Sequence, residues 1–305
     1  MKSEFYYDSL GQGKIHALQW QPEGEIKAVV QLLHGIAEHA DRYHDFAAFL
    51  NTQGILVVAE DHMGHGESMK QGGTRGYFRG GWFTAVDDSV ALMKRTMAEN
   101  PNVPYFLFGH SMGSFMTRTI LAKYPDSGIT GAVICGTGWL ADALLAAAIP
   151  ICKLVCKTKG EKHYSKFLQK LMFGNYNRRI EHPRTGYDWL TRDHRIVDAY
   201  EADPRCGFIC TAGLIRDMIG GIRYIQTDAA LSSMNKELPV FFIAGGDDPV
   251  GDYGAGVRRA AENFKNAGMK QVECKIYPLC RHEILNEINR EEVYGDVLQW
   301  LQGMM

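Results

Sequence analysis

Residues 105–113 read Tyr105-Phe106-Leu107-Phe108-Gly109-His110-Ser111-Met112-Gly113, an apolar run that leads into a serine between glycines. The apolar run predicts a strand buried on both faces, and residues 114–123 predict the helix that follows it. A strand-to-helix turn this tight forces its central residue into a strained conformation, which the glycines make sterically possible. The pattern G-x-S-x-G in this context predicts an exposed nucleophile, Ser111. The alternative is a turn serine that only caps the helix.

The segments on both sides of this turn alternate between strand and helix patterns. Apolar runs predict buried strands at residues 28–33, 55–59, 132–135, 238–244 and 272–277, and helical spacing predicts helices at residues 43–52, 83–99, 255–266 and 290–302. Residues 15–21 alternate apolar with polar residues and predict an antiparallel strand. Strands separated by helices of this length indicate an α/β fold, with a mostly parallel central sheet flanked by helices.

The alternation is interrupted between Gly138 and about Lys236. This region contains mixed helical stretches rich in Arg, His, Tyr and Met, and no run that predicts a buried strand. Because the alternation resumes at residue 238, the region predicts an insertion into one domain and not a separate domain. We therefore expect a catalytic α/β domain of residues 1–138 and 237–305, with a helical cap insertion of residues 139–236.

The composition is that of a soluble globular protein, with 46% hydrophobic and 22% charged residues among 305. A net charge of −2 gives no reason to expect a nucleic-acid partner. The N-terminus lacks the apolar segment and cleavage site of a secretory signal. The longest apolar stretch, residues 143–156, is interrupted by Pro150 and Lys153 and is too short to span a bilayer. We therefore expect no nucleic-acid partner and no stable insertion into a membrane.

Seven cysteines are scattered along the chain without the spacing of a disulfide scaffold. An odd number without such spacing favours a reducing compartment, so we expect a cytoplasmic protein. Cys152 with Cys156, and Cys206 with Cys210, have i,i+4 spacing and could each share a helix face. No His or carboxylate recurs at ligand spacing, which favours buried thiols over a metal site.

The loop after the strand at residues 28–33 continues as His34-Gly35-Ile36-Ala37-Glu38-His39. A tetrahedral oxyanion needs two backbone N–H donors, and chain order assigns them to Ile36 and Met112. His34 could be a catalytic base, but it precedes the nucleophile at a strand end, which favours a role in shaping the loop. Glu38, His39 and Arg42 are expected to fix this loop by hydrogen bonds or a salt bridge.

The acid and the base of such a site should follow the nucleophile in that order. Residues 240–250 supply a buried strand, a glycine turn and two candidate carboxylates, Asp247 and Asp248. His282 follows the next strand, and none of the ten other histidines has an equivalent position. The acid would hold one tautomer of the imidazole while the imidazole takes the serine proton. The alternative for His282 is a surface loop residue, and the residues alone leave Asp247 and Asp248 equally open.

Together these motifs resemble the monoacylglycerol lipase/lysophospholipase group of α/β-hydrolases, also described as serine-aminopeptidase-like. The matching stretches are His34-Gly35-Ile36-Ala37-Glu38-His39 with Arg42-Tyr43, Asp61-His62-Met63-Gly64-His65-Gly66-Glu67-Ser68, Gly109-His110-Ser111-Met112-Gly113, Gly245-Gly246-Asp247-Asp248-Pro249-Val250 and His282-Glu283. They span residues 32 to about 286 in the family's order. The family turn has its acid directly before the proline, so the resemblance implies Asp248. One departure is Ser114, where the family often has a second glycine, and it should alter only helix packing.

The resemblance implies an α/β-hydrolase fold with a helical cap and a Ser111, Asp248 and His282 triad. The implied activity is hydrolysis of carboxylic esters, most of all monoacylglycerol- or lysophospholipid-like lipid esters, through an acyl-enzyme on Ser111. No metal or organic cofactor is expected, and the expected partner is a small-molecule ester. The cap begins with apolar residues that suit an acyl chain or that simply pack it onto the domain, namely Trp139, Leu140, Leu144, Leu145, Ile149 and Ile151.

Two other interpretations stay open. The same triad could serve an aminopeptidase or a short-chain esterase, although the cap shows no acidic cluster for a substrate amine. The fold could also be a non-catalytic ligand-binding protein, against which the complete set of serine, acid and histidine argues. Acyl-chain length, head group and oligomeric state are not specified by the sequence.

Overall fold

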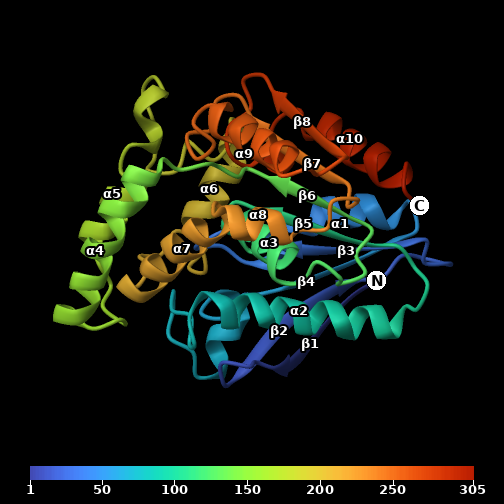
Figure 1. Cartoon of the computed structure of the whole chain (residues 1–305), viewed down its shortest axis with the longest axis horizontal. Helices are drawn as coiled ribbons and strands as arrows, with labels where there is room; N and C mark the ends of the chain where they lie inside the picture. The colour runs from blue at the N-terminus through green and yellow to red at the C-terminus, as the bar shows by residue number, and fades with distance from the viewer.

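A single eight-stranded sheet runs through the protein (Figure 1). The structure, a computed structural model, describes residues 1–305 except for the side chain of Gln71. The strands are β1 (Lys2–Asp8), β2 (Lys14–Trp20), β3 (Ala28–Leu33), β4 (Ile55–Glu60), β5 (Tyr105–His110), β6 (Gly131–Cys135), β7 (Val240–Gly245) and β8 (Val272–Tyr277). Their spatial order is β1-β2-β4-β3-β5-β6-β7-β8. In this spatial order, β4, β3, β5, β6, β7 and β8 are all parallel to one another. Strand β2 is antiparallel to both β1 and β4. The predicted α/β fold with a mostly parallel sheet is confirmed.

Helices cover both faces of the sheet because its inner strands are apolar on both faces. In β3, Val29 and Leu33 belong to one buried cluster, whereas Val30 and Leu32 belong to the other. One cluster includes residues of α1 (His44–Asn51) and α10 (Arg290–Gln302). The other includes residues of α2 (Trp82–Glu99), α3 (Met112–Lys123) and α9 (Ala255–Asn266). The alternation of side chains along each strand thus builds a core on each side.

Strand β1 was not expected from the sequence. Its burial pattern is mostly exposed, with only Phe5 and Tyr7 half-buried, because it forms the edge of the sheet next to β2. A strand that buries so little apolar surface has no continuous hydrophobic run to reveal it.

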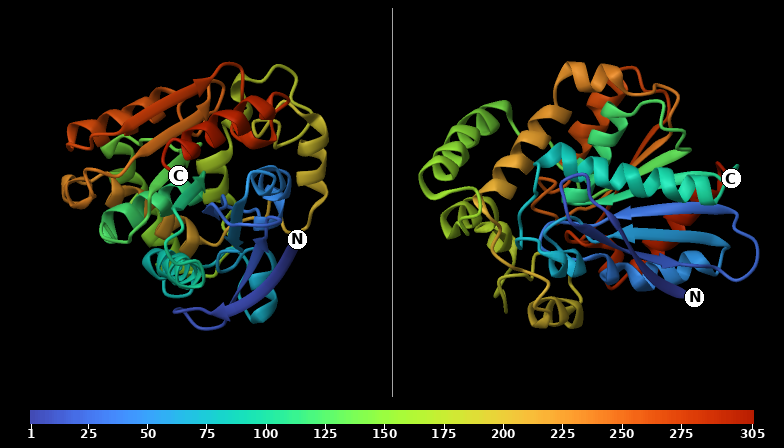
Figure 2. Two further views of the ribbon diagram at one scale, coloured as in Figure 1. Left: turned by 90° about the vertical axis from the view of Figure 1, so that its right-hand side faces the viewer. Right: turned by 90° about the horizontal axis from the view of Figure 1, so that it is seen from below.

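The region between β6 and β7 is helical, with five α-helices among its described residues: α4 (Asp142–Lys159), α5 (Lys166–Phe173), α6 (His194–Ala202), α7 (Ala212–Ile225) and α8 (Asp228–Ser233). Helices α4 and α5 stand at the margin of the molecule, on the side away from both chain termini (Figures 1 and 2). Helix α7 packs against α4 on one side and against α2 and α3 on the other, and α8 packs against α3. The cap boundaries at residues 139 and 236 stay a prediction.

Four 3-10 segments complete the described elements: η1 (Ala40–Tyr43), η2 (Gly66–Gln71), η3 (Tyr176–Arg179) and η4 (Ile284–Asn286). None of the helices in the described part of the chain combines the length and hydrophobicity that crossing a membrane requires.

The first turn of α3 passes directly over β3, and this close approach requires a glycine. A Cβ added to Gly113 would lie 2.0 Å from the carbonyl oxygen of Leu33. The obstructing atom is backbone, so no side-chain rotation can relieve the overlap. The sheet and α3 could accommodate a side chain here only by moving apart.

We predict that Gly113→Ala lowers the free energy of unfolding by about 3 kcal/mol, the upper range for an overpacked core position. Gly295→Ala, at an exposed position of α10, is the matched control, because no neighbouring atom lies within 4 Å of its added Cβ. There the same change should stabilise the protein by about 0.5–1 kcal/mol, through helix propensity. Urea unfolding followed by circular dichroism measures both. Equal effects of the two substitutions would show that α3 does not depend on this approach.

Candidate active site

Ser111 lies at the sharp turn between β5 and α3. Its φ of 52° and ψ of −118° are in a region that side chains rarely adopt, and its residue surface is 8% exposed. A Cβ added to Gly109 would lie 2.4 Å from the carbonyl oxygen of Gly113, so both flanking positions need glycine. The Ser111 side chain makes no capping hydrogen bond to described residues of α3. A strained residue that does not serve as a cap indicates a functional position.

The loop after β3 runs beside Ser111. A Cβ added to Gly35 would lie 3.2 Å from the Ser111 Cβ, and Ile36 and Met112 line the same cavity as Ser111. Among the described residues, neither the Ile36 N–H nor the Met112 N–H donates to a backbone carbonyl outside regular helices and strands. Both predicted donors are therefore free to bind an acceptor in the cavity.

Asp248 and His282 meet at the carboxyl ends of β7 and β8. Both are buried, and the His282 Nδ1 lies 3.0 Å from the Asp248 Oδ1. The same Asp248 oxygen accepts the Val250 N–H at 2.8 Å. Asp247 instead has an exposed side chain, and its N–H donates to the Cys280 carbonyl at 2.9 Å. The roles of Ser111, Asp248 and His282 in catalysis stay predictions.

The His282 imidazole is packed between charged and aromatic groups. Its ring centroid lies 4.6 Å from that of His110 and 5.1 Å from that of Trp189. Burial lowers the pKa of His282. The Asp248 charge and hydrogen bond, together with the Glu283 charge, raise this pKa by more than burial lowers it. The net pKa therefore lies above the ordinary 6.5. Burial also lowers the pKa of His110 to about 4, so that ring stays neutral.

A buried cluster of charges connects the loop after β3 with the loop that carries His282. The Arg42 Nη1 donates to Glu38 at 2.5 Å and to Glu283 at 2.6 Å, and its Nη2 donates to Glu283 at 2.7 Å. Glu38 also accepts the Gly35 N–H and the Tyr43 hydroxyl. The expected salt bridge within the loop is present, but its second partner, Glu283, was not expected. The sequence offered no local signal for this partner, because Glu283 lies 241 residues from Arg42 in the chain.

Two other histidines of this loop have local partners. The His34 Nε2 accepts the His62 N–H at 3.0 Å, which agrees with a role in shaping the loop.

The His39 Nε2 lies 3.0 Å from the Asp203 carboxylate of the insertion. His39, Asp203 and Cys206 place ligand atoms within 4.8 Å of one another, the spacing of a metal site. The Asp203 carboxylate is already paired with the Arg205 guanidinium at 2.8 Å, so a cation would meet competing positive charge there.

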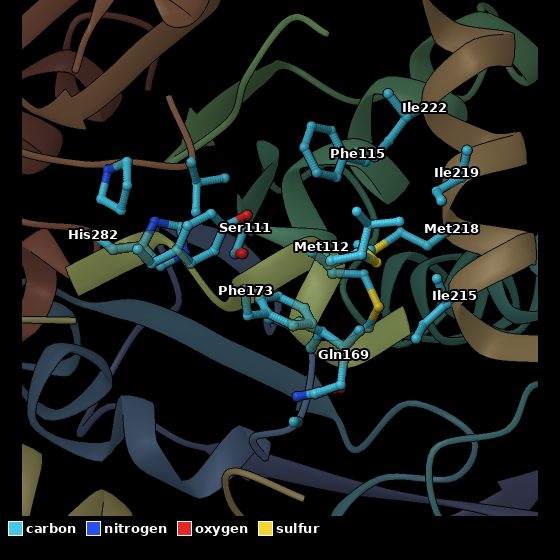
Figure 3. Close-up of a pocket in the computed structure, with 18 of the residues that line it drawn as sticks. Ser111, Met112, Phe115, Gln169, Phe173, Ile215, Met218, Ile219, Ile222 and His282 are labelled. Carbon is cyan, nitrogen blue, oxygen red and sulfur yellow. The ribbon is translucent and has the colours of Figure 1, made fainter. Parts of the chain in front are cut away.

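Ser111 and His282 open into a cavity of about 650 Å³ beneath the insertion. Figure 3 shows the side chains of Ile215, Met218, Ile219 and Ile222 projecting from α7 toward this cavity, opposite Phe115 and Phe173. Further apolar wall comes from α4 and α5, through Leu144, Leu145, Ala148, Ile151, Cys152, Leu168, Leu171 and Met172. Glu38, His110 and Glu283 form a polar end of the cavity near His282, and further polar side chains line it elsewhere, among them Gln169 of α5. The cavity thus has an apolar chamber and a polar end, with Ser111 between them.

The sheet, the glycine-flanked serine and the His282–Asp248 contact define an α/β-hydrolase. The chain belongs to the family described as "Serine aminopeptidase, S33", whose model matches residues 24–289. A monoacylglycerol lipase of Mycolicibacterium smegmatis is 31% identical over 98% of this chain and 97% of its own length. A thermostable carboxyl esterase from Bacillus coagulans, solved with glycerol, has a TM-score of 0.93 and 29% identity, covering 99% of this chain and 98% of its own.

A structure described as a lipase in its open form has a TM-score of 0.89 and 26% identity, covering 100% of this chain and 99% of its own. The predicted membership of the monoacylglycerol lipase-like α/β-hydrolases is confirmed. These relatives support ester hydrolysis as the class of reaction.

The raised pKa of His282 predicts where activity is lost in acid. With His282 in its predicted role as general base, which must be neutral to act, kcat/KM should fall as the pH drops through the His282 pKa, which lies above 6.5. The test is kcat/KM for a water-soluble ester from about pH 5 to about pH 9, the range in which imidazoles titrate. Circular dichroism at each pH controls for unfolding. An acid limb centred below the ordinary imidazole value in folded protein would contradict the prediction.

Proposed function

We propose that this protein is a serine hydrolase that cleaves neutral monoacylglycerol-like esters through an acyl-enzyme on Ser111. The observation that carries the proposal is the cavity, which has an apolar chamber and is lined by a strained serine and by a histidine paired with a buried aspartate. An acyl chain would lie in that chamber, with its ester carbonyl at Ser111. The glycerol would lie at the polar end of the cavity.

In the proposed reaction, the Ser111 Oγ attacks the ester carbonyl and passes its proton to the His282 Nε2. Asp248 holds the Nδ1 proton and stabilises the imidazolium that forms. The Ile36 and Met112 N–H groups bind the oxyanion, helped by the positive end of α3. The imidazolium then protonates the leaving alcohol. A water molecule deprotonated by His282 attacks the acyl-enzyme, and the carboxylic acid leaves.

The charges around the cavity favour a neutral head group over a phosphate. Among the described residues that line the cavity there is no Lys or Arg, and the charged side chains are the carboxylates of Glu38, Asp252 and Glu283. Arg42 does not line the cavity, but it pairs with Glu38 and Glu283 and neutralises part of their charge. Asp252 is exposed to solvent. A phosphate would meet carboxylates without a cation to pair with. This favours monoacylglycerols over lysophospholipids.

The walls of the chamber also favour an acyl group over a peptide. In the described part of the insertion, no Asp or Glu lines the cavity. A free α-amino group would therefore enter an apolar space without a counter-charge from the cap, which costs free energy. An acyl chain would instead gain the favourable burial of its methylene groups, about 0.8 kcal/mol each.

A substrate panel tests the proposal. It compares monoacylglycerols of increasing chain length, lysophosphatidylcholine, lysophosphatidic acid and aminoacyl amides on wild type and on Ser111→Ala. We expect monoacylglycerols to have the highest kcat/KM, and Ser111→Ala to lose on the order of 10³-fold or more activity together with fluorophosphonate labelling. Labelling of a different serine, or a preference for the anionic lipid, would overturn the assignment.

Substitutions of Asp247 and Asp248, the two aspartates in the turn after β7, should have different effects. Asp248→Asn keeps the shape of the side chain but favours the wrong imidazole tautomer, so kcat should fall by about 10²–10⁴-fold. Asp247→Asn changes an exposed side chain and should alter stability by less than about 0.5 kcal/mol. Steady-state kinetics and thermal unfolding of both variants provide the comparison. A kcat loss that follows Asp247 instead would show that the other carboxylate orients His282.

A further inference from the structure

The segment of the insertion at residues 188–192 is hydrogen-bonded to the loop that carries His282. We call residues 278–289 the base loop. The His282 N–H donates to the Trp189 carbonyl at 3.3 Å, and the Glu283 N–H donates to the Leu190 carbonyl at 2.7 Å. Arg281 donates from one nitrogen to the carbonyls of Asp188, at 2.7 Å, and Thr191, at 3.1 Å. The backbone on both sides of His282 is thus held by the insertion.

Glu287 ties the two segments together from the other side. It is fully buried, and its Oε1 accepts the Arg281 N–H at 2.8 Å and the Arg192 N–H at 3.2 Å. Its Oε2 pairs with the Arg192 guanidinium at 2.9 Å. One carboxylate therefore bonds both the residue before His282 and a residue of the insertion. Charge-assisted bonds of this kind are stronger than neutral ones.

The side chain of Trp189 completes this contact by packing against the imidazole. The two ring centroids lie 5.1 Å apart with planes inclined by 39°. The indole meets the Tyr176 ring edge-on with ring centroids 4.8 Å apart. The backbone that carries it is held as well, because the backbone N–H of Trp189 donates to the Asn177 Oδ1 at 2.9 Å. Both His282 nitrogens must point in defined directions, and a ring beside the imidazole restricts its rotation.

We infer that Trp189, carried on the insertion segment 188–192, is a positioning residue for His282, so that the cap takes part in setting the catalytic base. The inference rests on the proposed function, in which His282 is the base. Trp189 also lines the substrate cavity, so the competing explanation is a role in the wall alone. The two explanations differ in the kinetic parameter that they affect.

Loss of a positioning residue lowers kcat for every ester, whereas loss of a wall residue changes KM for long acyl chains. We expect Trp189→Leu to lower kcat between about tenfold and about 10²-fold for both p-nitrophenyl acetate and a long-chain monoacylglycerol, the scale set by small displacements of catalytic groups. Trp189→Phe, which keeps a ring at this position, should recover most of the loss. An unchanged kcat with a raised KM for the long-chain ester would overturn the inference.

Trp139→Leu is the matched control. Trp139 is a half-buried tryptophan of the same cavity, packed near the Arg118 guanidinium at 5.5 Å and outside the contacts of the base loop. Its substitution should act mainly on KM for the long-chain ester. A fall in kcat equal to that of Trp189→Leu would also overturn the inference, because it would show a general effect of opening the cavity.

A spectroscopic measurement reports on the base itself. The proton shared by the His282 Nδ1 and Asp248 should give a low-field ¹H resonance in wild type and in Trp139→Leu. In Trp189→Leu it should broaden, because water reaches the pair and the imidazole turns more freely. A resonance equally sharp in all three proteins would contradict positioning by Trp189.

Arg281→Met serves as a second variant in case Trp189→Leu fails to fold, which circular dichroism will show. It removes the two bonds to the carbonyls of Asp188 and Thr191 and leaves the indole in place. We expect kcat to fall about fivefold or more for both esters, as His282 loses its alignment. An unchanged kcat would overturn the inference. Absence of fluorophosphonate labelling in wild type would instead reject the proposed function, so the two failures are distinguishable.

Discussion

The buried contact of Arg42 with Glu38 and Glu283 joins the two loops on which the site depends. Removing such charges from water costs several kcal/mol per ion, and only good geometry with further hydrogen bonds offsets the cost. Here Glu283 receives two guanidinium bonds, and Glu38 also holds Tyr43 and the Gly35 N–H. The position of the loop beside Ser111 and the position of His282 are therefore not independent. Any movement of one would strip a buried charge of its partner.

The same cluster influences the pKa of His282, the proposed base, as well as its position. Two carboxylates face one guanidinium, so a negative charge is left near the imidazole. Although burial opposes ionisation of Glu283, Arg42 holds its pKa at about 2, and the charge persists across the physiological range. Together with Asp248 it raises the pKa of His282. In its proposed role the imidazole would be a stronger base, but it becomes protonated sooner as the pH falls. His110 adds no charge because burial keeps it neutral.

Local patterns in the sequence predicted the inner strands, the serine turn and the chain order of acid and base. Each of these depends on a few adjacent residues, such as the apolar run that alternates between two cores in β3. The choice between Asp247 and Asp248 needed a family turn, since adjacent side chains diverge only once the backbone is folded. Glu283 lies 241 residues from Arg42 in the chain, and neither residue shows a pattern that selects the other. The packing of Trp189 on His282 is equally a product of tertiary structure.

The insertion divides into two parts with different relations to the chemistry. Its second part is bonded to both loops of the site, since the Ala37 carbonyl accepts the Gly207 N–H and the Tyr200 hydroxyl, each at 2.9 Å, while segment 188–192 holds the base loop. Helices α4 and α5 instead supply chamber wall, and in the described part of the chain they share no hydrogen bond with residues 278–289. The wall that α4 and α5 supply is therefore not tied to the loop of His282 by hydrogen bonds, unlike the wall at Trp189 and Leu190.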